Sequence, residues 1–551
     1  MTAWHQHLSV LPVLLPAATA IGLLLLGDQG GSSHGHRRLL LARRLGLGSA
    51  ALGLLIALAL ALQADTGALA VYRLGDWPAP FGIVLVVDRL SALMLVLTGL
   101  VALPVLVYAS GGWDARGRYF HALFQFQLMG LNGAFVTGDL FNLFVFFEVL
   151  LIASYVLMLH GGGHERLRVG LHYVVRNLVA SALFLIGTAL IYGLTGTLNF
   201  ADLALRVPQV LGPDAALLKA GALLLLLVFG FKAALAPLSL WLPATYAAAS
   251  PPVAALFAIM TKVGVYAILR VHGVVFGDFA PAGPGDSAAL VAQPLLLPLA
   301  LAGSVVAVLG ALASHSLNRL VAWLTVASVG TILAAIGLFG TPAWSAALYY
   351  LANSTLVIAG LFLLCELVAA QRGDAGGRLL PASAVAQPAL LGLLLLLAAA
   401  SSAGLPPLPG FIGKVMLLQA SYGHAWAGML WAVVLGVGLL TLLGLARAGS
   451  ILFWHVRTDL GVAAVGASPR LVLATVSLVG ASVAMSVLAA PLMRYTDAAA
   501  AQLTDRAAYA RAVLPEMGGA AAQTARPYTG QRPATLAPAA AAVPAAAGSS
   551  R

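Results

Sequence analysis

The chain has 551 residues, a formal net charge of +11, 61% hydrophobic residues and only 9% charged residues, with a mean hydropathy of +0.98. This composition excludes a water-soluble globular domain and predicts a polytopic membrane protein. The basic residues lie in loops and in the C-terminal tail without interleaved aromatic residues, which argues against nucleic-acid binding. The single cysteine, Cys365, lies in an apolar run, so it excludes an internal disulfide framework and argues against a cysteine-ligated metal cluster.

Apolar runs of about 20 residues recur along the chain, the length that an α-helix needs to cross about 30 Å of hydrocarbon. The first run has no Lys or Arg before it, so we interpret it as the first helix rather than as a cleaved signal peptide. We expect about fourteen membrane-spanning helices, with approximate ranges of 8–27, 38–63, 83–109, 119–137, 140–160, 167–194, 215–241, 251–272, 292–314, 317–339, 343–370, 386–422, 426–455 and 468–492.

Basic residues cluster in alternate loops between these spans. Because loops rich in Arg and Lys stay on the cytoplasmic side, these loops should be cytoplasmic, and an even number of spans then places both termini on the outer side. The clustered residues are Arg37, Arg38, Arg43, Arg44, Arg116, Arg118, Arg166, Arg168, Arg319, Arg372, Arg378, Arg447 and Arg457.

One carboxylate, Glu148, lies near the middle of the apolar stretch "GDLFNLFVFFEVLLIASYVLML" at 138–159. A lone carboxylate at that depth costs roughly 2.5 to 3.5 kcal/mol on insertion scales, so Glu148 should have a partner or a task. Asp139, just before the run, is expected to cap the start of the helix.

Lysine is used sparingly. Of 29 Lys and Arg residues only four are Lys, namely Lys219, Lys232, Lys262 and Lys414, and all four fall in or beside predicted spans. An ammonium loses its proton readily when it is desolvated, whereas a guanidinium does not. This pattern indicates that deprotonation matters at membrane depth, although Lys219 lies near the start of its span and is better explained as reaching toward the interface.

Two of these lysines lie in interrupted helices. Lys232 lies in "VFGFKAALAPLSLWLP", where Pro237 and Pro243 interrupt the helix, and Lys414 lies in "SSAGLPPLPGFIGKVMLLQ", where Pro406, Pro407 and Pro409 do the same. Proline removes an intrahelical hydrogen bond, and freed backbone groups at membrane depth are tolerated only where protein or water satisfies them. Paired interrupted segments in two halves of a chain are the sequence sign of inverted repeats around an ion path.

Five segments together resemble the antiporter-like subunits shared by respiratory complex I and the multisubunit Mrp-type (also Mnh or Pha) cation/proton antiporters, and the D-type subunits of the latter are the best match. They are "VDRLSALML", "TGDLFNLFVFFEVLLIASYVL", "TGTLNFADLA", "FKAALAPLSLWLPATYAAASPPVAALFAIMTKVGVYAILR" and "GLPPLPGFIGK". The resemblance covers roughly residues 80–490. It implies an all-α polytopic membrane protein of about 14 helices, with two inverted five-helix repeats and two discontinuous helices.

The resemblance also implies roles for individual residues in proton translocation. Glu148 corresponds to the glutamate of the family's helix 5 and Lys232 to the lysine of its broken helix 7, and the two would form an ion pair. Lys262 falls on the central lysine of helix 8 and Lys414 on the terminal lysine of broken helix 12. Together they would form a polar axis at half-membrane depth.

The sequence departs from the family's pattern between Lys262 and Lys414. Leu324 and Ile358 stand where histidine and lysine often appear, Asn353 replaces a frequent histidine and Asn318 a frequent lysine. Two explanations remain open: the path runs elsewhere, or water carries protons between neutral polar side chains, among them Ser328, Thr331, Asn353 and Ser354.

The resemblance divides the chain into N-terminal helices 1–3 at 1–118, a first repeat of helices 4–8 at 119–272, a second repeat of helices 9–13 at 292–455 and helix 14 at 456–492. The tail at 505–551 is rich in Ala and Pro and is expected to be disordered.

The function implied is that of a proton-translocating subunit of a monovalent cation (Na⁺ or K⁺)/proton antiporter, a secondary transporter rather than an enzyme. The alternative is a proton-pumping membrane subunit of a complex I-type NADH:quinone oxidoreductase or a membrane-bound hydrogenase, and a third possibility is a non-transporting scaffold. The detailed match of the helix 5 segment and the lack of a long amphipathic helix after the last span favour the antiporter, and the buried charges argue against the scaffold. We expect no cofactor and no metal, a multi-pass location in the inner (plasma) membrane, and other subunits of a hetero-oligomeric complex as partners.

Overall fold

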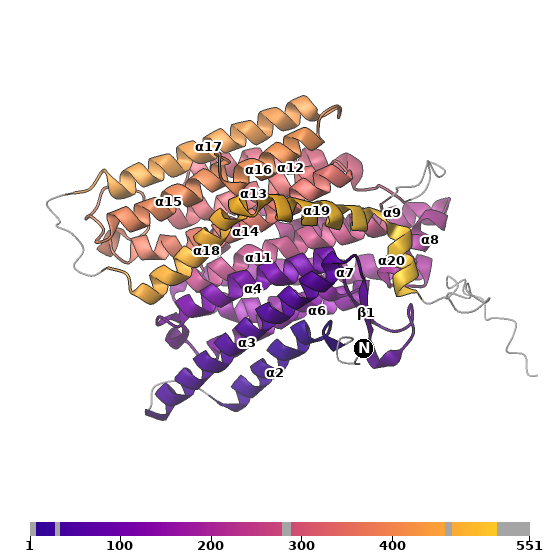
Figure 1. Cartoon of the computed structure of the whole chain (residues 1–551), viewed down its shortest axis with the longest axis horizontal. Helices are drawn as coiled ribbons and strands as arrows, with labels where there is room; N and C mark the ends of the chain where they lie inside the picture. Colours follow the sequence, from indigo (N-terminus) through magenta and orange to yellow (C-terminus); the bar gives the residue numbers. More distant parts are fainter. Residues whose placement is uncertain (1–6, 28–32, 278–287, 458–465, 515–551) are drawn as a thin grey trace, which may run out of the picture.

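The computed structural model describes residues 7–27, 33–277, 288–457 and 466–514. Helices dominate it and lie side by side, with their long axes roughly along the horizontal of Figure 1. The α-helices are α2 (Leu11–Leu25), α3 (Ser33–Asp65), α4 (Arg89–Ala109), α5 (Phe120–Val136), α6 (Leu140–Leu159), α7 (His164–Thr195), α8 (Phe200–Arg206), α9 (Pro213–Ala233), α10 (Trp241–Ala248), α11 (Pro251–Ala267), α12 (Gln293–Leu312), α13 (Leu317–Ile336), α14 (Thr341–Ala369), α15 (Pro388–Ala403), α16 (Pro409–Ala420), α17 (Ala427–Phe453), α18 (Pro469–Val487), α19 (Ala489–Thr504) and α20 (Arg506–Val513).

The expectation of a multi-pass membrane protein is confirmed. Among the described residues, 11 helices are long and apolar enough to cross a membrane, and two shorter apolar helices are α2 and α15. The count differs from about fourteen because three expected spans contain no helix long enough. Helix α2 has 15 residues, α5 has 17, and the span at 386–422 is divided into α15 and α16, with 16 and 12 residues.

A small hairpin interrupts the helical pattern between α3 and α4. Strand β1 (Ala70–Arg73) pairs antiparallel with β2 (Val84–Val87), and Ala70 lies opposite Val87. The β-branched run of β2 is buried on both faces, which suits a strand better than an exposed helix. We did not expect this hairpin from the sequence.

Two five-helix units repeat the same local geometry. In the first unit, α5 to α11, an isolated antiparallel bridge joins Asp139 before α6 to Asn199 after α7; in the second, α12 to α17, a bridge joins Ser316 before α13 to Arg378 after α14. Asp139 and Ser316 also cap the helices that follow them, by accepting from the amides of Asn142 and Arg319. The cap expected at Asp139 is confirmed.

The two units are inverted relative to each other. Successive spans between the two bridges are antiparallel, and four of them, with α9 and α10 counted together, separate α6 from α13. Helix α6 and helix α13 therefore begin at opposite ends of the bundle, so one bridge lies at each end. Each unit contains one discontinuous helix, α9 and α10 in the first and α15 and α16 in the second.

The core runs through both units. Every residue of α11 is buried, and so is nearly every residue of α14, which packs against α11, α13, α16, α18 and α19. A continuation of α11, the π-helical segment η5 (Ile268–Val275), is likewise buried. Charged side chains on these helices are therefore enclosed by protein rather than by lipid.

The chain after α17 differs from the sequence expectation. The last predicted span, 468–492, is divided into α18 and α19, and α19 extends it to Thr504. Residues 505–514, expected to belong to a disordered tail, contain helix α20, whereas 515–551 lie outside the described residues.

Helix α20 is ordered because one of its faces is buried. Tyr509 and Val513, four positions apart, are 5% and 0% exposed. The Arg506 guanidinium donates to the carbonyl groups of Ala204 and Val275, and so ties α20 to α8 and to the end of η5. Figure 1 shows α20 beside α8 and near β1 at the right-hand end of the bundle.

We predict different outcomes for two truncations of the C-terminus. Deleting residues 515–551 should leave the thermal stability of the purified protein unchanged, because that segment is too poor in large apolar residues to form a core. Deleting residues 506–551 should lower the melting temperature by several degrees, since it removes the buried Tyr509 and the Arg506 contacts. Equal melting temperatures for the two truncated proteins would show that α20 does not stabilise the bundle.

Candidate functional site

Lys232 occupies the end of a half-helix. It lies in the last turn of α9, one residue before the helix ends at Ala233, and its side chain is 7% exposed. Its ammonium donates to the Asn177 side-chain oxygen at 3.3 Å and lies 5.7 Å from the centre of the Phe147 ring. The negative end of the α9 dipole favours a cation here. Pro237 lies in the break between α9 and α10.

Glu148 lies on α6 and is partly buried. Its carboxylate accepts a hydrogen bond from the Ser181 hydroxyl on α7. The expected ion pair with Lys232 is not formed, since in the part of the chain that the structure describes no nitrogen–oxygen contact of 4.0 Å or less joins them. Asn177 and Ser181 of α7 contact these two charged groups instead.

Lys262 is fully buried in the middle of α11. The hydrogen bond of its ammonium within the described residues is a long one, 3.4 Å, to the Thr261 hydroxyl. Three residues, Lys262, Tyr266 and Arg270, follow at intervals of four and therefore share one face of the helix. An ammonium so weakly bonded at membrane depth is a candidate for a functional role.

Lys414 binds the end of another half-helix. Helix α15 ends at Ala403, and the Lys414 ammonium on α16 donates to the carbonyl of Ala403 at 2.6 Å and to that of Ser402 at 3.4 Å. Pro406 and Pro407 lie in the break, and Pro409 is the first residue of α16. The break thus exposes carbonyl groups that an unbroken helix would use internally, and the lysine satisfies them.

A small cavity lies beside Lys414. Its volume is about 20 Å³, which is room for about one water molecule. The lining contains three of the four positions where the sequence departs from the family, Leu324, Asn353 and Ile358, but not Asn318. The other lining residues are Ala327, Ser328, Thr331, Tyr350, Ser354, Val357, Ser402, Lys414, Val437 and Thr441.

Two of the lining groups are suited to holding water. The Ser402 hydroxyl is buried and has no hydrogen-bond partner within the described residues. The Asn353 side-chain oxygen accepts from Ser401 at 3.1 Å and from Ser482 at 2.7 Å, which fixes the orientation of its amide. A polar cavity with an unsatisfied hydroxyl is a place where bound water is expected.

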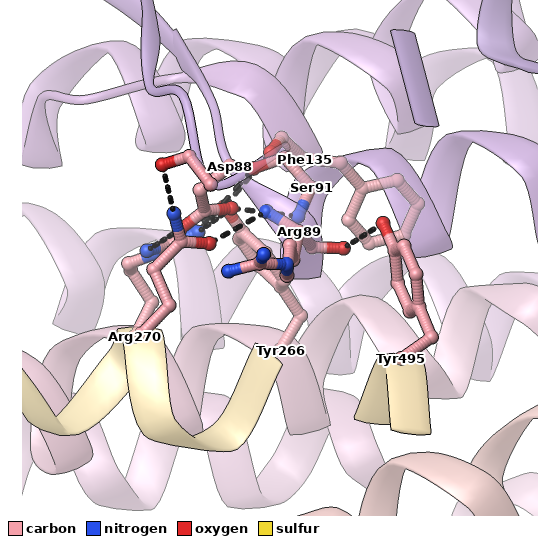
Figure 2. Close-up of polar contacts among 9 residues, drawn as sticks. Asp88, Arg89, Ser91, Phe135, Tyr266, Arg270 and Tyr495 are labelled. Carbon is pink, nitrogen blue, oxygen red and sulfur yellow. Dashed lines mark hydrogen bonds and ion pairs between the residues drawn. The ribbon is translucent and has the colours of Figure 1, made fainter. Parts of the chain in front are cut away.

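A second charged cluster lies at the end of α11 and was missed in the sequence. Figure 2 shows Arg270 reaching Asp88, and the two form a bidentate ion pair of 2.6 and 2.9 Å. Tyr266 donates to the Phe135 carbonyl at 2.8 Å and accepts from Arg270 at 3.3 Å. Asp88 and Arg270 are 182 positions apart, so no local pattern could pair them.

The Asp88 carboxylate is held in its charged form. Burial alone would raise the pKa of Asp88, but the Arg270 guanidinium and the Ser91 amide outweigh burial and keep this pKa below its usual value. Removing one partner of a buried pair leaves an uncompensated charge and costs about 3–5 kcal/mol. The pair therefore anchors the start of α4 to the start of η5.

A third cluster joins the helices at the start of the chain. Asp114 accepts from Arg43 at 2.7 and 2.8 Å and lies 2.9 Å from His121. Burial acts to raise the pKa of Asp114, but Arg43 and His121 together hold it below the ordinary value. Within the described ranges, no three His, Cys, Asp or Glu side chains come together as metal ligands would.

This arrangement defines a class of polytopic membrane protein with two inverted repeats, two broken helices and lysines enclosed at membrane depth. The chain belongs to the NADH:quinone oxidoreductase/Mrp antiporter transmembrane family, whose model matches residues 137–441, more than half of the chain. The family expected from the sequence is therefore confirmed.

Individual relatives show which members of the family the chain is similar to. The chain is 41% identical to the D subunit of a probable K⁺/H⁺ antiporter of Rhizobium meliloti, covering 93% of this chain and 98% of the relative. It is 35% identical to the D subunit of the Na⁺/H⁺ antiporter of Alkalihalophilus pseudofirmus, covering 93% of this chain and all of the relative. A chain of the Mrp complex from a Dietzia species matches with a TM-score of 0.80 at 27% identity, over 93% of this chain and 100% of that chain. A chain of respiratory complex I from Thermus thermophilus shares the fold, with a TM-score of 0.72 at 24% identity, over 90% of this chain and 99% of that chain.

Proposed function

We propose that this chain is the proton-translocating, D-type component of a multisubunit monovalent cation/proton antiporter in the cell membrane. The observation that carries the proposal is the position of three buried lysines. Lys232 lies in the last turn of the half-helix α9, the Lys414 ammonium binds the end of the half-helix α15, and Lys262 lies in the fully buried helix α11. The relatives named as Na⁺/H⁺ and K⁺/H⁺ antiporter subunits cover almost the whole chain, which favours an antiporter over an oxidoreductase subunit.

The proton path would run from the pair of Glu148 and Lys232 through Lys262 to Lys414. Each lysine is enclosed by protein, and its bonds are to neutral groups, so its proton can leave without breaking an ion pair in this structure. A proton arriving near Glu148 would change the field at Lys232 and favour transfer to the next lysine. The protonation state of Glu148 would thus influence whether Lys232 passes its proton on.

Water near Lys414 would complete the second half of the path. The cavity bounded by Asn353, Ser402 and Lys414 has room for about one water molecule, and the Asn353 and Ser402 side chains are neutral. Such a water can pass a proton to Lys414 although Leu324 and Ile358 cannot titrate. This favours the water route over a path that runs elsewhere.

The orientation in the membrane follows from the distribution of arginine. The loops that contain Arg37, Arg116, Arg166 and Arg372 would face the cytoplasm. Both termini, the hairpin of β1 and β2, and α20 would then lie on the outer side. Other subunits of a hetero-oligomeric antiporter would be the partners of this chain, and Na⁺ or K⁺ would be the exchanged ion.

Glu148→Gln tests the proposal directly. The variant keeps the side-chain volume but removes the charge, so the complex should assemble while cation-dependent collapse of a proton gradient in everted vesicles falls at least about tenfold, a barrier change of about 1.4 kcal/mol. Membrane levels of the subunit serve as the control. Normal antiport in the Gln variant would contradict the role of Glu148 in proton translocation.

Substitutions of Lys414 test whether this residue carries a proton or only supplies a fixed positive charge. An ammonium can release its proton when it is buried, but a guanidinium hardly can, so Lys414→Arg should be almost as inactive as Lys414→Ala. Antiport is measured in both variants at matched membrane levels. An active Arg variant beside an inactive Ala variant would mean that Lys414 supplies only a positive charge.

The cavity is tested at Asn353. Asn353→Leu fills the site with apolar atoms and should lower antiport at least about tenfold, whereas Asn353→His restores a titratable group and should retain most of the activity. Vesicle assays with equal amounts of assembled complex provide the comparison. Full activity of the Leu variant would exclude a proton path through this cavity.

A further inference from the structure

Helix α7 lies between the two charged groups of the first unit. It packs against α6, which carries Glu148, and against α9, which carries Lys232. Two of its polar side chains, Asn177 and Ser181, are four positions apart and therefore lie on one face of the helix. They are 1% and 6% exposed, so water does not compete freely for their hydrogen bonds.

Each of these side chains is committed to one charged group. The Asn177 amide nitrogen donates to the Tyr173 carbonyl of its own helix at 2.9 Å, which leaves the amide oxygen facing the Lys232 ammonium at 3.3 Å. The Ser181 hydroxyl donates to the Glu148 carboxylate. The orientation suits both charges, because a carbonyl oxygen attracts an ammonium and a hydroxyl proton attracts a carboxylate.

The two contacts compete with a direct ion pair. The Glu148 carboxylate bound to Ser181 and the Lys232 ammonium bound to Asn177 do not touch, although both sit beside the same two turns of α7. A direct contact between them would add a strong attraction at low dielectric, and this attraction would oppose release of the lysine proton. When Asn177 and Ser181 bind them separately, Glu148 and Lys232 each keep a hydrogen-bond partner, and Lys232 can still release its proton.

We propose that Asn177 and Ser181 are positioning residues that hold Glu148 and Lys232 apart, so that Lys232 can release its proton in each transport cycle. The inference rests on the proposed function and adds a regulatory element to it. Asn177 and Ser181 thus help to set how easily Lys232 loses its proton, which does not depend on Glu148 and Lys232 alone. Direct contact of Glu148 with Lys232 would then be a second, proton-retaining state.

Three variants test the role of the α7 side chains. Asn177→Asp has nearly the same shape but places a carboxylate against Lys232, so antiport at neutral pH should fall about tenfold or more, with the pH optimum moving upward by about one unit. Ser181→Ala frees Glu148 to approach Lys232 and should shift the optimum in the same direction by a smaller amount. Ser181→Thr keeps the hydroxyl and should restore the wild-type profile.

A matched control exists on the same pair of helices. The Ser154 hydroxyl on α6 bonds the Tyr173 hydroxyl on α7 at 2.9 Å and the Leu151 carbonyl at 2.7 Å, rather than either charged group. Ser154→Ala therefore removes a buried hydroxyl without breaking a bond of Glu148 or Lys232, and it should leave the pH profile unchanged. All variants are assayed in the whole complex in everted vesicles, with membrane levels and melting temperatures measured beside them.

The outcomes separate this inference from the proposed function. An unshifted pH profile in both Asn177→Asp and Ser181→Ala, together with an inactive Glu148→Gln, would overturn the role of α7 and leave the proton path standing. Equal shifts in Ser181→Ala, Ser181→Thr and Ser154→Ala would show a general packing effect and would also overturn it. An active Glu148→Gln would instead contradict the proposed function itself.

Discussion

The cost of enclosing a charge away from water governs the arrangement of this bundle. A charged side chain at membrane depth must bind something polar, and at each such site the chain supplies a different partner. Arg270 binds a carboxylate, Lys232 an amide oxygen and Lys414 two backbone carbonyls. Arg270 is thus neutralised by an opposite charge, whereas the two lysines are bound by neutral groups.

The broken helices supply part of this polarity without any additional charge. A helix that stops inside the protein leaves carbonyl groups without partners, and these form a neutral site for an ammonium. Lys232 lies on the half that ends, whereas Lys414 lies on the half that begins and reaches back to the end of α15. The two lysines therefore have different polar partners, because Lys232 donates to a side chain of α7 and Lys414 donates to the carbonyl groups at the end of α15.

Among the described residues, no carboxylate lines the cavity beside Lys414 in the second unit. Around Lys414 the cavity is lined by hydroxyl and amide groups, with Leu324 and Ile358 beside them. At the far end of α11, the ion pair of Asp88 and Arg270 fixes the helix while remaining fully charged. Lys262 on α11 and Arg270 in η5 thus have different partners, a neutral hydroxyl and a carboxylate.

The sequence by itself determined the membrane class, the breaks near Pro237 and Pro407 and the depth of the lysines, because hydropathy, proline and charge act locally along a helix. Local motifs also indicated the family, and the resemblance to that family implied the inverted repeats. What only the tertiary structure decided depends on neighbours far apart in the chain. The pairing of Asp88 with Arg270, the insertion of Asn177 and Ser181 beside Glu148 and Lys232, and the burial of α20 were of this kind. No local pattern predicts them, since each depends on which helix packs beside which, and that is set by the fit of whole apolar surfaces.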